Sequence, residues 1–73
     1  MKIKRLERIH REHYFEYLLE VDIGGLNYGA TISLHEDTKE IDKTAREVIS
    51  TYIAREVGAK IYSQISEISI KEV

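Results

Sequence analysis

Residues 15–34 read FEYLLEVDIGGLNYGATISL, and this stretch decides the fold. Apolar residues recur at every second position on both sides of Gly24-Gly25, so they share one face of a pleated ribbon. A Gly-Gly pair between two such runs is typical of a two-residue turn with positive φ. The stretch therefore predicts a β-hairpin that pairs Ile23 with Leu26 and Phe15 with Leu34.

Residues 2–11 are predicted to form a first strand, antiparallel to residues 14–23. The main reason is charge, because opposite charges on neighbouring strands stabilise a sheet. A helix is the alternative, since Ile3, Leu6 and Ile9 also have helical spacing. The strand register centred on Glu12 pairs Lys2 with Asp22, Lys4 with Glu20, Leu6 with Leu18, Arg8 with Glu16, and His10 with Tyr14.

A helix is predicted after the hairpin. Asp37-Thr38-Lys39-Glu40 has the form of a capping box, with Asp37 or Thr38 as the N-cap. Apolar residues then recur at helical spacing as far as Val57, and Gly58 is a natural stop. The predicted core between sheet and helix contains Phe15, Tyr17, Leu19, Val21, Ala30, Ile32, Ile41, Ala45, Val48, Ile49, Tyr52 and Ile53.

The last segment, residues 59–73, is predicted to be a long fourth strand whose inward phase changes at Ser66-Glu67, as at a β-bulge. Its place is open between two spatial orders, 3-2-1-4 and 1-2-3-4, because both are right-handed crossovers. The prediction is one α+β domain over residues 1–73. It has a three-stranded antiparallel meander, one helix on its apolar face and a fourth C-terminal strand.

Composition bounds the class of protein. A chain of 73 residues buries only about 60–65% of its unfolded surface, so its core is marginal. It has no cysteine, which excludes a disulfide or a cysteine zinc site. One Asn and one Gln in a chain that is 33% charged is a thermophile-like profile. The lack of a long apolar run or a signal segment predicts a cytoplasmic protein.

Two clusters of polar residues are candidate sites. His10, Tyr14 and His35 are predicted to lie in a row on the outer sheet face, as a ligand site. The two histidines would be about 9.6 Å apart with the tyrosine between them, which disfavours shared metal ligation. The second cluster is a basic edge that could contact nucleic acid, formed by Arg5, Arg11 and His13.

No motif for catalysis, a metal or a cofactor is present, so we expect a protein that is not an enzyme and has no cofactor. The expected function is a non-catalytic protein-interaction module, a regulator, inhibitor or subunit, acting through a homo-oligomer. A small core and exposed strand edges both favour a partner, and a two-fold dimer is the simplest form. The predicted contact residues are Leu6 and Leu18 on the outer face, and Ile68, Ile70 and Val73 in the last strand.

Overall fold

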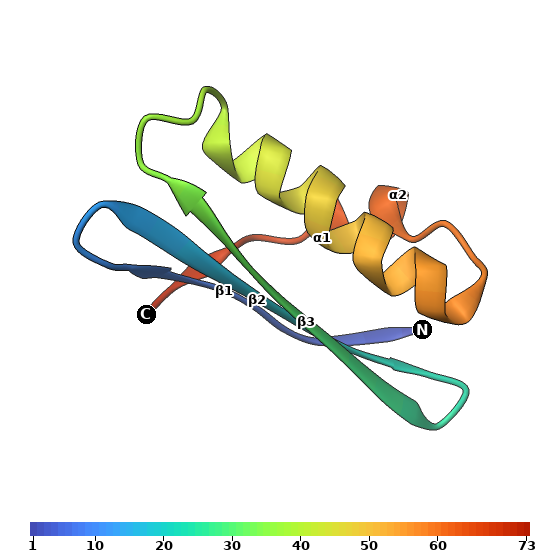
Figure 1. The fold of residues 1–73 in the computed structure, drawn as a ribbon. Coiled ribbons are helices and arrows are strands. Elements are labelled where there is room, and N and C mark those ends of the chain that lie inside the picture. The colour runs from blue at the N-terminus through green and yellow to red at the C-terminus, as the bar shows by residue number, and fades with distance from the viewer.

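The computed structural model describes residues 1–73 as a four-stranded sheet with its helices on one face (Figure 1). The sheet order is β3-β2-β1-β4, with β4 parallel to β1 and the other pairs antiparallel. This confirms the α+β prediction and selects the 3-2-1-4 order. The elements are β1 (Lys2–His10), β2 (Tyr14–Ile23), β3 (Leu26–His35), α1 (Ile41–Val57), α2 (Tyr62–Ile65) and β4 (Lys71–Glu72).

The β2–β3 hairpin has the predicted register along its whole length, from Ile23 opposite Leu26 to Tyr14 opposite His35. Gly24 and Gly25 have φ of 59° and 83°, in a backbone region that residues other than glycine rarely adopt. The turn is tightened by Asp22, whose carboxylate accepts the Gly25 N–H at 3.1 Å. Local sequence alone is thus sufficient to set this hairpin.

β1 is a strand, as predicted, but its register changes after Ile3. Ile3 lies opposite Val21 and Arg5 opposite Glu20, so Lys4 is an extra residue in a β-bulge. A one-residue slip turns every later side chain to the other face. Leu6 therefore lies opposite Leu19 in the core, only 5% exposed, and the predicted Leu6–Leu18 pair on the outer face is wrong. The predicted Arg8–Glu16 pair is wrong for the same reason, since Arg8 lies opposite Tyr17.

α1 begins at Ile41, so the predicted capping box is wrong. Glu40 stands at the N-cap in a left-handed conformation, with no side-chain cap hydrogen bond. The preceding residues form a turn instead, in which the Thr38 N–H donates to the His35 carbonyl at 3.0 Å. The predicted stop is confirmed, because Gly58 has a φ of 68° and its N–H donates to the Ala54 carbonyl at 2.8 Å.

The core lies between the sheet and α1, as predicted. One predicted core residue is wrong: Tyr52 is 45% exposed, because it lies about 100° around α1 from the fully buried Ile53. Phe15, Ala30, Ile41 and Val48 are half-buried at the margin of the core. The predicted residues that are buried are Tyr17, Leu19, Val21, Ile32, Ala45, Ile49 and Ile53.

The last segment differs most from its prediction. In place of one long strand it contains α2, a turn and the two-residue β4. Ile61 and Ile65 are four residues apart, so a helical turn buries both of them against the core. Arg46 holds the segment, since its guanidinium donates to the Ile65 carbonyl and, at 2.6 Å, to the Ile68 carbonyl. The phase change at Ser66 marks the end of α2.

Candidate functional site

A polar network joins three strands to α1 beside the core. The Tyr17 hydroxyl donates to Asp42 at 2.6 Å, and Arg8 donates to the same carboxylate oxygen at 3.0 Å. Arg8 also pairs with Glu72 in β4 at 3.1 Å, and its backbone carbonyl accepts the Val73 N–H at 2.9 Å. The network therefore clamps the C-terminus and the first turn of α1 to the sheet. The sequence pattern missed it because Arg8 faces inward only after the bulge.

Burial, together with the hydrogen bond to Asp42, raises the pKa of Tyr17 to about 12. The folded state therefore holds this proton more tightly than the unfolded state, whose tyrosine pKa is about 10. The resulting stability is fully present below pH 10 and is lost as the pH rises towards about 12.

We expect the wild-type protein to lose about 2–3 kcal/mol of stability across this range through Tyr17. Thermal unfolding measured through the same pH range checks this prediction, with Tyr17→Phe as the matched variant. The variant should show a flatter pH dependence. An equal dependence of stability on pH for the two proteins would mean that the pKa of Tyr17 is not raised in the folded state.

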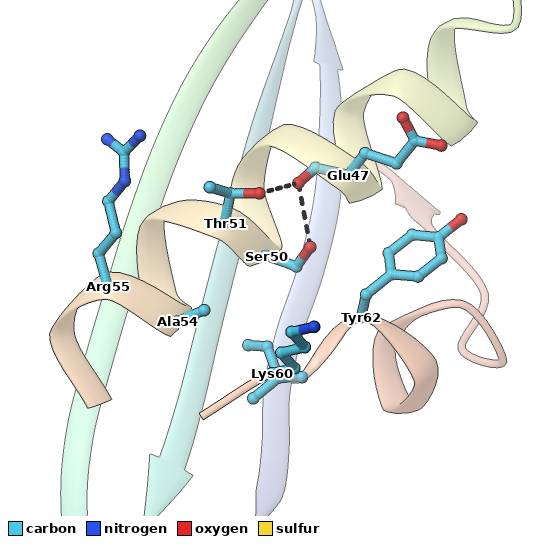
Figure 2. Close-up of a pocket in the computed structure, with 8 residues that line it drawn as sticks. Glu47, Ser50, Thr51, Ala54, Arg55, Lys60 and Tyr62 are labelled. Atoms are coloured by element: carbon cyan, nitrogen blue, oxygen red, sulfur yellow. Dashed lines mark hydrogen bonds between the residues drawn. The ribbon is translucent and has the colours of Figure 1, made fainter. Parts of the chain in front are cut away.

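A groove of about 450 Å³ lies between α1 and the segment that includes α2 (Figure 2). Its two helix hydroxyls are occupied, because Ser50 and Thr51 both donate to the Glu47 carbonyl, at 3.1 and 2.8 Å. Lys60 lies within the groove, whereas the Arg55 side chain extends away from it. The charged groups thus do not converge on one point. Because α2 was predicted as a strand, nothing in the sequence pattern indicated this groove.

The predicted row of His10, Tyr14 and His35 does not form. Tyr14 and His35 are opposite each other on β2 and β3, but His10 lies opposite Phe15 and stacks on its ring at 4.3 Å. The bulge in β1 has moved His10 to the other face of the sheet. No group of three or more His, Asp or Glu side chains is placed to hold a metal ion.

Each residue of the predicted basic edge lies beside a carboxylate. Arg5 donates to Glu7 at 2.7 Å, and this hydrogen bond holds the pKa of Glu7 below its usual range. Arg11 lies 3.4 Å from Glu16, and His13 lies 3.7 Å from Glu12. The outer face of the sheet is therefore a mixed surface in which acidic groups accompany the basic ones.

The five predicted interaction residues are not brought together. Leu18 is half-buried on the outer sheet face, opposite Thr31 and Glu7, whereas Leu6 is in the core. Ile68 and Ile70 pack against the core of their own chain, which removes the reason for assigning them to a partner. Val73 is 67% exposed at the C-terminus.

The free long edge of the sheet is β3. It has a neighbour on one side only, it is ten residues long, and its pairing with β2 is unbroken by any bulge. The strand contains no proline and no charged residue except His35, if that histidine is protonated. Leu26 at its start is 62% exposed. Strand edges in monomeric proteins are usually shortened, charged, bulged or covered, and β3 has none of these protections.

No family model, curated protein or solved structure matches this chain. None of its helices combines the length and the apolar character needed to cross a membrane.

Proposed function

We propose that this chain is a non-catalytic protein-interaction module, a regulator, inhibitor or subunit, that acts through a homo-oligomer. Its binding surface is the open edge of β3. The observation that carries the proposal is a ten-residue edge strand with no lysine, proline or bulge. Such an edge presents a row of unpaired backbone groups, which is the template for adding a strand from another chain.

The rest of the surface supports binding through this edge. The outer sheet face carries Glu7, Glu16, Glu20 and Asp22 beside Lys2 and Arg5, so a phosphate backbone would meet carboxylates as well as basic groups there. The edge of β1 is already occupied in part by β4, at Glu7 and Arg8. The β3 edge is uncharged and needs only backbone hydrogen bonds from a partner. Binding of nucleic acid through Arg5, Arg11 and His13 remains the alternative to be tested beside it.

The experiment compares capture of cross-linked partners by three tagged proteins in extracts of the source cell. They are the wild type, an edge variant with Thr31→Lys and Ser33→Lys, and a control with Thr51→Lys on the exposed side of α1. We expect the edge variant alone to lose its partners. Equal capture by all three would contradict the proposal.

A salt series on the captured complexes tests the alternative function. Complexes with nucleic acid weaken steeply as salt rises, because bound cations are released from the phosphates. A complex made by strand pairing should change little. Loss of the partners after nuclease treatment, with a steep salt dependence, would support nucleic-acid binding instead.

A further inference from the structure

We infer that the strand that pairs with β3 is β3 of a second copy, antiparallel to it, with the two-fold axis at Ala30. This inference rests on the proposed function and names the partner and the register. In an antiparallel pair, two residues that lie directly opposite each other have their side chains on the same side of the sheet. A two-fold axis between two identical strands must therefore pass through a residue position, where that residue lies opposite its own copy. An axis at Ala30 fits both the free backbone groups of β3 and the pattern of its side chains.

The backbone groups of β3 are free at alternate residues. A two-residue hairpin closes on a hydrogen-bonded pair, here Ile23 and Leu26, and such pairs recur at every second residue. The intervening residues point their N–H and carbonyl groups away from β2. The His35 carbonyl is already used by the Thr38 N–H. The free set is therefore Asn27, Gly29, Thr31 and Ser33, which is symmetric about Ala30.

The side chains match in the same register. With the axis at Ala30, Tyr28 faces Ile32 of the partner subunit, and Leu26 faces Leu34 of the partner subunit. All of these lie on the inner, apolar face of the sheet. The 62% exposed Leu26 would then be covered by an aliphatic side chain. On the outer face, Gly29 meets Thr31 and Asn27 meets Ser33, so polar residues meet small or polar ones.

The acidic side chains of β2 are better separated when two β3 edges pair than when two outer sheet faces stack. The acidic side chains of β2, Glu16, Glu20 and Asp22, would be three strand spacings from those of the second copy, about 14 Å. That distance exceeds the screening length of about 8 Å at physiological salt. Stacking two outer faces would bring the same rows closer, to about 10 Å between the sheets. Pairing of β3 edges thus keeps the acidic side chains of the two copies further apart than stacking does.

Sedimentation of the purified chain tests the dimer. We expect the wild type to be dimeric at micromolar concentration, and the Thr31→Lys variant to dissociate with a Kd raised about tenfold or more. The two introduced lysines would lie diagonally across the interface, about 7–8 Å apart. Mixing Thr31→Lys with Thr31→Glu should restore a dimer, because opposite charges then meet. Thr51→Lys is the control and should sediment like the wild type.

A disulfide tests the register. The chain has no cysteine, so a single introduced thiol can be followed without background. Ala30 would face its own copy in a non-hydrogen-bonded pair, with Cα atoms about 4.5 Å apart, which is within disulfide range. Ala30→Cys should therefore cross-link on mild oxidation and Thr51→Cys should not. An edge-dependent dimer in which Ala30→Cys does not cross-link would overturn the register.

The outcomes separate this inference from the proposed function. A wild type that sediments as a monomer, while extract partners are still lost on Thr31→Lys/Ser33→Lys substitution, overturns the second copy as partner. It also overturns the homo-oligomer of the proposed function, but it leaves the β3 edge as the surface that binds another protein. A dimer that Thr31→Lys does not weaken, although circular dichroism shows the variant folded, overturns both. Restoration of the dimer by the mixed charges supports both.

Discussion

Replacing Ile49 with alanine is expected to lower the free energy of unfolding by about 2–5 kcal/mol, the usual cost of deleting a large buried aliphatic side chain. Ile49 is fully buried in the middle of α1, within the cluster that includes Leu19, Tyr17 and Ile53. In a domain of 73 residues this is a large part of the total stability. The variant is therefore expected to be partly unfolded near physiological temperature.

Urea unfolding followed by circular dichroism measures the effect on Ile49→Ala. Thr51→Ala is the control, because Thr51 is exposed two residues further along the same helix. The control should change the stability by less than about 0.5 kcal/mol. If both variants unfold at the wild-type urea concentration, α1 does not pack on the sheet through this face.

Replacing Asp42 with alanine is the second large expected effect, about 1–3 kcal/mol of lost stability. The Asp42 carboxylate accepts hydrogen bonds from the buried Tyr17 hydroxyl and from Arg8. Alanine leaves the buried Tyr17 hydroxyl without its acceptor, and Arg8 keeps only Glu72 as a carboxylate partner. Asp42 also lies in the first turn of α1, where a negative charge stabilises the helix.

Two further substitutions resolve the Asp42 effect. Asp42→Asn keeps an oxygen that can accept the Tyr17 hydroxyl but loses the charge, so it should lie between alanine and the wild type. Asp37→Ala, in the exposed turn before α1, should be close to neutral. Equal stability of Asp42→Ala and Asp37→Ala in urea unfolding would contradict the clamp described for Arg8 and Tyr17.

The β2–β3 hairpin could be predicted residue by residue because everything that sets it is local. Alternation with period two defines the faces, and Gly24-Gly25 defines the turn. The register of β1 could not be predicted the same way. The basic residues Lys2, Lys4 and Arg8 favour an unbroken register, in which each faces an acidic residue of β2. Burial of Leu6 in the core instead favours a bulge with one extra residue at Lys4. Apolar burial outweighs surface ion pairs, which contribute little.

The structure of the C-terminal segment could not be predicted from its sequence, because the spacing of its isoleucines is ambiguous. Isoleucines at 61, 65, 68 and 70 fit both a bulged strand and a helical turn followed by an extended chain. The choice depends on Arg46, far away in sequence, whose guanidinium binds the Ile65 and Ile68 carbonyls. The candidate binding edge also depends on contacts between distant parts of the chain, because these set the strand order. β3 is an edge in the order 3-2-1-4 but would be an inner strand in 1-2-3-4, so its identity as the open edge required the fold.

The short β4 covers part of the second edge of the sheet. It occupies β1 at Glu7 and Arg8 and is held there by the Arg8–Glu72 ion pair. A sheet that is open at both edges can add copies indefinitely and grow into a fibre. A strand that covers Glu7 and Arg8 hinders the addition of a further copy at this second edge. In a dimer paired through β3, the two residues of β4 would thus oppose growth into a polymer.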